Sequence, residues 1–230
     1  MRAFASLAVV VSVTACAGGL SVPPVPAGQR PATEAQVATW VAATRPTRNE
    51  KIYMHFRVDN GNGAAGGHGT VSVAPPDSIA FGFAGPLGAR NGAGVVLGDS
   101  LAWGVPEEDV RNIVPNYPLF WAMLGVARPP AAGSTLTGLD DAKVRAWRYV
   151  RGRDTVDYVQ TRSGIPEFYA YVRQNGKPLG RVVARLDASG QVISARLVIL
   201  TTPYKLDITF DSVKYIPSFP KDTWNAPRDQ

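Results

Sequence analysis

Few side chains in this chain of 230 residues are suited to covalent or metal chemistry. The sequence contains one cysteine, Cys16, and two histidines, His55 and His68. Two histidines without a free thiol cannot complete a zinc site, and the acidic residues lack the spacing of metal ligands. The glycine-rich segment 61–69 joins two predicted strands, whereas a phosphate cradle lies between a strand and a helix. We therefore expect no metal, no cofactor and no catalytic residue.

Ser100 is the candidate that argues for an enzyme. Residues 98–101, Gly-Asp-Ser-Leu, resemble the opening block of GDSL-type esterases, and the resemblance would make Ser100 the nucleophile. Those enzymes also use a histidine near the C-terminus to accept the serine proton, whereas His55 and His68 both precede Ser100. Gly-Asp-Ser between two short apolar runs is also typical of a hairpin turn. An esterase therefore remains the minor alternative.

The N-terminus predicts export and lipid attachment. Arg2 precedes an apolar run over residues 3–13 that is too short to cross a bilayer, which is typical of a signal peptide covering residues 1–15. The sequence Val-Thr-Ala-Cys ending at Cys16 resembles the bacterial lipobox, and this implies cleavage before Cys16 and its acylation by chains such as palmitate. Ala17 is not the aspartate associated with inner-membrane retention, so we expect an outer-membrane anchor facing the periplasm. An ordinary secreted protein with a stray cysteine is the alternative.

A tether and one folded domain follow the signal peptide. Residues 16–32 contain four prolines and read as a flexible Pro-rich tether, and residues 33–230 are long enough for a single domain. The formal charge of +6 falls to about +5 when Arg2 is removed. Nucleic acid is not expected as a partner of an exported protein. The basicity indicates either attraction to anionic lipid surfaces or a solvated surface without a specific partner.

The pattern of apolar residues predicts a sheet-rich fold. Thr33 and Gln36 form a predicted capping box for a helix that Pro46 ends. Strand candidates cover residues 51–58, 69–74, 78–84, 94–97, 101–105, 144–150, 155–161, 167–173, 181–187, 191–200 and 204–215. Residues 192–200 are apolar on both faces, which predicts a central strand. We expect a mainly β fold: a strongly curved, incomplete antiparallel β-barrel of about ten or eleven strands, closed by short helices.

Two apolar features lack an obvious partner. Leu87 lies in the surface turn Gly-Pro-Leu-Gly over residues 85–88, where it forgoes about 1.5–3 kcal/mol of burial unless something covers it. Residues 117–126 predict a short helix that is apolar nearly all round, so protein, ligand or a partner must cover every side of it. Both features are consistent with contact to lipid. A leucine packed against a neighbouring strand and a plain core helix are the alternatives.

These pieces resemble the LolA/LolB family of periplasmic lipoprotein carriers, and most of all its LolB-like outer-membrane lipoproteins. The resemblance rests on the lipobox at Cys16, the turn at residues 85–88, the helix segment 118–125 and the β-rich second half. It implies a half-barrel whose apolar cavity holds acyl chains, and a membrane-contact loop at Pro86 and Leu87. The residues expected to line the cavity are Phe81, Phe83, Trp103, Phe120, Trp121, Met123 and Leu124.

The resemblance also implies partners and a function. The partners would be lipid acyl chains or lipoprotein cargo, the inner leaflet of the outer membrane and a periplasmic carrier that donates the cargo. We expect a lipid-anchored carrier or acceptor that delivers lipoproteins or other lipids to the outer membrane without catalysis. The alternative is a structural or interaction lipoprotein whose core is filled by its own side chains.

Overall fold

The computed structural model describes residues 25–85, 91–107, 110, 111, 114, 116–162 and 164–226. Cys16, Pro86 and Leu87 lie outside the described residues, so their expected roles stay predictions. Among the described residues, no helix combines the length and apolarity needed to cross a membrane.

One antiparallel sheet of 13 strands dominates the fold, in the order β1-β7-β8-β9-β10-β11-β12-β13-β2-β3-β4-β5-β6. The strands are β1 (Arg30–Pro31), β2 (Glu50–Asp59), β3 (Ala64–Ala74), β4 (Ser78–Ala84), β5 (Gly92–Leu97), β6 (Ser100–Val105), β7 (Thr135–Asp140), β8 (Val144–Arg151), β9 (Asp154–Thr161), β10 (Glu167–Gln174), β11 (Lys177–Leu186), β12 (Val192–Ile199) and β13 (Lys205–Tyr215). The first strand β1 pairs with β7, the last strand in the order is β6, and the sheet does not close.

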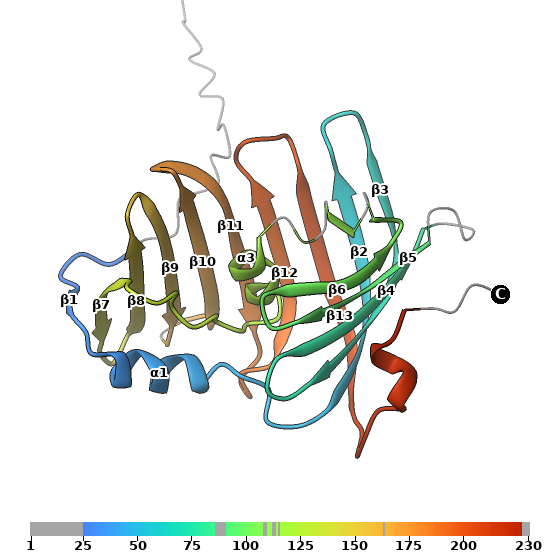
Figure 1. Cartoon of the computed structure of the whole chain (residues 1–230), viewed down its shortest axis with the longest axis horizontal. Coiled ribbons are helices and arrows are strands. Elements are labelled where there is room, and N and C mark those ends of the chain that lie inside the picture. The colour runs from blue at the N-terminus through green and yellow to red at the C-terminus, as the bar shows by residue number, and fades with distance from the viewer. Residues whose placement is uncertain are drawn as a thin grey trace, which may run out of the picture.

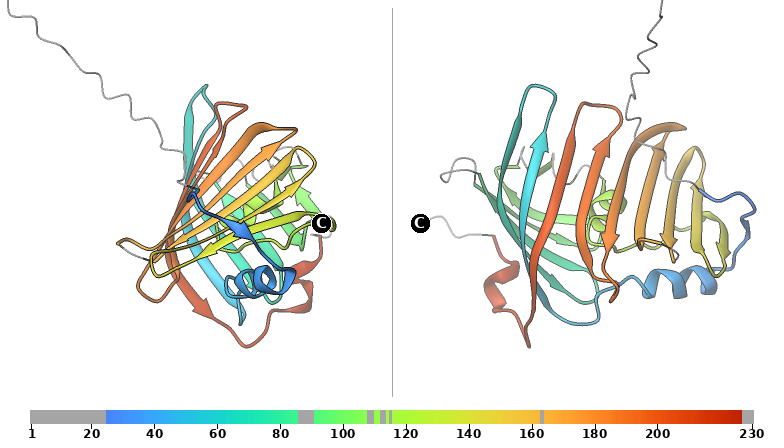
Figure 2. Two further views of the ribbon diagram at one scale, coloured as in Figure 1. Left: turned by 90° about the vertical axis from the view of Figure 1, so that its left-hand side faces the viewer. Right: turned by 180° about the vertical axis from the view of Figure 1, so that it is seen from behind.

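The sheet curves strongly, so that its β4–β6 end passes in front of the central strands (Figures 1 and 2). This confirms the predicted mainly β, incomplete antiparallel barrel. β12 stands in the middle of the strand order, as its apolar character on both faces predicted. The strand number exceeds the prediction because β1 and β7 were missed. The apolar pattern of β7 is interrupted by Gly138. At this glycine the Trp40 ring occupies the space of a side chain and lies 2.4 Å from where a Cβ would be.

The segment between β2 and β3 is shorter than we expected. The glycine-rich stretch 61–69 was expected to join two strands, but β3 begins at Ala64 and includes Gly66, Gly67 and Gly69. A Cβ on Gly69 would lie 2.6 Å from Met54 Cε, so the glycine leaves room for the methionine side chain of the neighbouring strand. The glycines therefore shape the inner surface of the sheet.

Two α-helices lie against the concave face. The helix α1 (Glu34–Ala42) begins with the predicted capping box, in which Thr33 Oγ1 accepts a hydrogen bond from the Gln36 amide at 3.2 Å. Trp40 of α1 packs on Trp147 of β8 with ring centroids 6.0 Å apart. The helix α3 (Tyr117–Ala122) packs on β10 and β11 inside the curve of the sheet (Figure 1). Its all-apolar surface is therefore covered largely by the sheet.

A short 3-10 helix, η2 (Lys221–Trp224), follows β13 near the C-terminus. Its Trp224 carbonyl accepts a hydrogen bond from Trp103 Nε1 of β6 at 3.3 Å. The Phe219 and Trp224 rings also contact one another, with centroids 5.4 Å apart. This segment therefore ties the end of the chain to the β6 end of the sheet.

Candidate functional site

An apolar cavity of about 50 Å³ lies on the concave face between α3 and strands β2, β3, β4 and β13. Among the described residues, the side chains that line it are all apolar: Met54, Phe56, Val58, Val71, Phe81, Phe83, Phe120, Met123, Leu124, Leu206 and Ile208. Phe81, Phe83, Phe120, Met123 and Leu124 are five of the seven residues that we expected to line a cavity. The cavity therefore brings side chains from the end of β4 together with side chains from α3 and the residues that follow it.

Strand alternation places the other lining residues. Met54, Phe56 and Val58 occupy one face of β2, because side chains two residues apart in a strand point to the same side of the sheet. The register of β2 and β13 then brings Leu206 opposite Val58 and Ile208 opposite Phe56. Leu206 and Ile208 were not among the residues expected in the cavity, because their position depends on a pairing between segments about 150 residues apart in the chain.

Aromatic side chains pack closely around this cavity and leave it small. The rings of Phe81 and Phe120 lie 5.7 Å apart, and those of Phe56 and Phe83 lie 6.1 Å apart and edge to face. Ligand pockets commonly measure about 300–1,000 Å³, so 50 Å³ does not accommodate a long acyl chain without movement of these side chains.

Two residues expected in the cavity have other positions. Trp121 is fully buried, and its Nε1 donates a hydrogen bond to the Gly98 carbonyl at 2.9 Å. Trp103 is partly buried and bonds to Trp224, as described above. Neither ring lines the apolar cavity. Both tryptophans instead join separate elements, which follows from the need of a buried indole N–H for an acceptor.

Arg128 holds the β4–β6 end of the sheet against the other half of the molecule. Its Nε donates to Asp99 at 2.8 Å and its Nη2 to Asp77 at 3.1 Å, and the guanidinium lies 5.0 Å from the Trp121 ring centroid. The backbone of Arg128 bonds to the hydroxyls of Tyr149 and Tyr158, which belong to β8 and β9. Burial raises the pKa of both hydroxyls above the ordinary tyrosine value. We call this group of residues the Arg128 latch.

The Arg128 latch explains the Gly-Asp-Ser sequence at residues 98–100. Gly98 has a φ of +59° and turns the chain between β5 and β6, and Asp99 binds Arg128. Ser100 is exposed and begins β6. These residues form the hairpin turn that the sequence offered as the alternative to a nucleophile.

The two histidines lie far from Ser100. His68 pairs with Ala84 at one end of β4, whereas Ser100 pairs with Leu97, which lies opposite Ser78 at the other end. The strands β3 and β6 are also three positions apart in the sheet, about 14 Å at the usual spacing. His55 Nδ1 instead contacts the Asp211 carboxylate at 2.7 Å, and the His55 and His68 rings touch. In the parts of the chain that the structure describes, no group of three metal-ligating side chains is placed to hold an ion.

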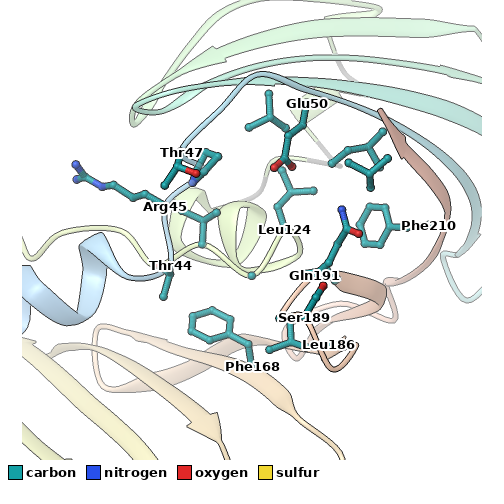
Figure 3. Close-up of a pocket in the computed structure, with 18 of the residues that line it drawn as sticks. Thr44, Arg45, Thr47, Glu50, Leu124, Phe168, Leu186, Ser189, Gln191 and Phe210 are labelled. Atoms are coloured by element: carbon teal, nitrogen blue, oxygen red, sulfur yellow. The ribbon is translucent and has the colours of Figure 1, made fainter. Parts of the chain in front are cut away.

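A larger pocket of about 370 Å³ lies beside the apolar cavity (Figure 3). The segment between α1 and β2, the end of α3, the β11–β12 turn and β13 surround it. Its floor is apolar and includes Ile52, Phe168, Leu186 and Phe210. Leu124 lines both the pocket and the apolar cavity. The two spaces are therefore neighbours on either side of one leucine side chain.

Polar side chains lie around this apolar floor. Figure 3 shows the Glu50 carboxylate directed into the pocket toward Leu124, with the Gln191 amide on the opposite wall. Burial raises the pKa of the Glu50 carboxyl above its usual value, and the positive charge of Arg48 opposes that rise. Arg48 lies with its guanidinium 3.3 Å from the ring centroid of Tyr215. Arg48 and Glu50 were not among the expected site residues. The signal for Glu50 in the sequence is a carboxylate at the start of the apolar row of β2.

The fold and site together define a half-open antiparallel barrel with an apolar cavity on its concave face. The structure is similar to a LolA superfamily protein from Nitrosomonas europaea, with 11% identity, a TM-score of 0.41 and coverage of 85% of this chain and 99% of that one. A putative outer-membrane lipoprotein-sorting protein domain from Vibrio parahaemolyticus matches with 9% identity and a TM-score of 0.36, covering 83% and 95% of the two chains.

MucB matches with 10% identity and a TM-score of 0.36, covering 84% of this chain and 62% of MucB. No family model matches the chain, and no curated protein matches its sequence significantly. The structural comparison names the same group of proteins as the resemblance found in the sequence. At these identities the likeness concerns the fold alone.

Proposed function

We propose that this protein is a lipid-anchored periplasmic carrier or acceptor that binds acyl chains of lipoproteins or other lipids and helps to deliver them to the outer membrane. The observation that carries the proposal is the pair of adjoining spaces on the concave face. One has an entirely apolar lining, and the other measures about 370 Å³ above an apolar floor. A volume of that size lies within the usual range for ligand pockets.

Acyl chains would enter through the larger pocket and extend past Leu124 into the apolar cavity. Displacement of the Leu124 side chain would join the two spaces, since it is the lining residue that they share. Rotation of Met123 and Phe83 would then enlarge the cavity, because methionine is flexible and Phe83 is only partly buried. Such a carrier needs an affinity matched to donor and acceptor, and no covalent step.

Cys16 and Leu87 complete the proposal. An acylated Cys16 would hold the domain near the inner leaflet of the outer membrane, and a periplasmic carrier would donate the cargo. Leu87, together with Pro86, would contact the bilayer during delivery. The support for both residues comes from the sequence: the lipobox, and an aliphatic residue in a turn of glycine and proline.

Substitution of Leu124 tests the acyl-chain site. A Cys16→Ser protein purified from cells is expected to retain acyl lipids, detected by native mass spectrometry. Leu124→Trp should lower the bound fraction about tenfold, because the larger side chain occupies the junction of the two spaces. Leu97→Trp is the matched control, since Leu97 is 43% exposed and lines neither space, and it should bind as the parent protein does.

Two outcomes would contradict the proposal. If the parent protein neither retains nor takes up lipid, the alternative of a structural lipoprotein with a self-filled core replaces it; the small volume of the apolar cavity is the observation that favours that alternative. If the protein hydrolyses a short acyl ester and Ser100→Ala abolishes the activity, the esterase replaces it.

A further inference from the structure

Glu50 breaks the apolar pattern of the concave face. The inward row of β2 consists of Glu50, Ile52, Met54, Phe56 and Val58, and the last four are apolar. Glu50 stands at the end of this row and pairs with Val73 and Tyr215 on the neighbouring strands. A charged side chain at the border of an apolar surface costs stability and is typical of functional positions.

The Glu50 carboxylate is directed into the larger pocket and is not neutralised by a close partner. Among the described residues, no side chain lies within hydrogen-bond or ion-pair distance of this carboxylate, and the neighbouring charge that acts on it is that of Arg48. Partial burial raises the pKa of Glu50, which reflects the incomplete solvation of its charged form. The carboxylate is therefore free to accept hydrogen bonds from a ligand in the pocket.

Positive charge lies at the mouth of the same pocket. Arg48 is held over the Tyr215 ring, and Arg45 lines the pocket with its Nε buried and without a hydrogen-bond partner in the described structure. In Figure 3 the end of the Arg45 side chain extends away from Glu50. The pocket therefore presents a carboxylate above its apolar floor and, at the exposed Arg48, a guanidinium group nearer the solvent.

We propose that this pocket binds the zwitterionic head group of a phospholipid, with the ammonium group at Glu50 and the phosphate near Arg48. The inference rests on the proposed function, because the acyl chains of the same molecule would occupy the apolar floor and the cavity beyond Leu124. A purely anionic head would bring a second negative charge toward Glu50, and a purely cationic head would face Arg48. A head with both charges pairs with both side chains.

Short-chain lipids that share their chains and differ in their heads test the inference. Titration calorimetry would measure dihexanoyl phosphatidylethanolamine, dihexanoyl phosphatidylglycerol and uncharged dihexanoylglycerol against the Cys16→Ser chain. The ethanolamine lipid is expected to bind about tenfold more tightly than the glycerol lipid, which corresponds to about 1.4 kcal/mol. Glu50→Gln should abolish this preference, while Glu34→Gln, an exposed carboxylate of α1, should leave it unchanged.

A second variant examines the phosphate. Arg48→Gln should weaken binding of both phospholipids and leave dihexanoylglycerol unaffected, and Arg57→Gln, an exposed arginine of β2, is its control. Thermal unfolding would verify that each variant is folded. Equal affinities for the two phospholipids, or a preference that survives Glu50→Gln, would overturn the head-group inference and leave acyl-chain binding intact. Failure of all three lipids to bind would instead overturn the proposed function.

Discussion

At the scale of single residues, Arg128 connects parts of the chain that are distant in sequence. Its guanidinium is almost fully buried, and it binds Asp77 and Asp99, which are 30% and 51% exposed. Those carboxylates belong to two different turns, β3–β4 and β5–β6. Because the arginine is buried and its partners are partly solvated, loss of the arginine should cost less than loss of a fully buried ion pair.

Arg128→Ala is therefore expected to lower the free energy of unfolding by about 2–3 kcal/mol. Arg196→Ala is the matched control, because Arg196 forms an exposed ion pair with Asp207 and should contribute less than about 0.5 kcal/mol. Urea denaturation followed by circular dichroism would measure both. Equal effects of the two substitutions would show that the Arg128 latch does not hold the two halves together.

Residue type alone indicated which apolar side chains line the cavity for some of the expected residues and not for others. Phe81, Phe83, Phe120, Met123 and Leu124 line the apolar cavity, because strand alternation and helical packing act over short distances. Trp103 and Trp121 were equally apolar in the sequence but bond to Trp224 and Gly98. Their positions depend on which acceptor reaches the indole N–H, and the folded chain decides that.

At the scale of elements, the end of α3 sets the position of Leu124. Asn116 Oδ1 accepts a hydrogen bond from the Leu119 amide at 3.3 Å and begins the helix. The helix is followed by Gly125, which has a φ of +73°, and a Cβ there would lie 2.9 Å from Val192 Cγ2. Gly125 thus provides both a left-handed backbone conformation and a close approach to β12. Together these fix the position of the preceding residue, Leu124, which borders both the pocket and the apolar cavity.

A pair of glycine substitutions separates the contribution of the positive φ from that of the close approach to Val192. Gly133 has a φ of +77°, and a Cβ there would meet no atom within 4 Å. Gly133→Ala should therefore cost about 1–2 kcal/mol from backbone strain alone. Gly125→Ala should cost about 1–3 kcal/mol more, because its methyl group also collides with Val192. Unfolding free energies from urea denaturation would test this, and equal losses would exclude a packing role for Gly125.

At the scale of the whole molecule, the curved sheet leaves one concave face on which α1 and α3 pack (Figures 1 and 2). Its strand order places β12 at the centre and β1 and β6 at the two ends. Because the sheet is not closed, side chains from α3 complete the inner surface. The proposed carrier would combine this concave face with a membrane tether at Cys16 and a contact loop at Leu87.

Substitution of the proposed contact residue tests that arrangement. Leu87→Glu should leave the unfolding free energy unchanged and reduce transfer of a fluorescent acyl lipid from the protein to anionic vesicles about tenfold, since a charge disfavours entry into the bilayer. Ile165→Glu is the matched control, because Ile165 is an exposed aliphatic residue, 64% accessible, in another loop. Transfer by Leu87→Glu at the parental rate would remove the membrane role of this residue.

The sequence by itself determined the curved antiparallel sheet, the start of α1, the central position of β12 and the inward row of β2. These features follow from periodicity and capping, which act between residues close in the chain. Only the tertiary structure decided that Asp99 binds Arg128, that Leu206 and Ile208 reach the cavity and that Glu50 faces a pocket. The reason is physical: these arrangements depend on strand register and loop approach between distant segments, and local preferences do not specify them.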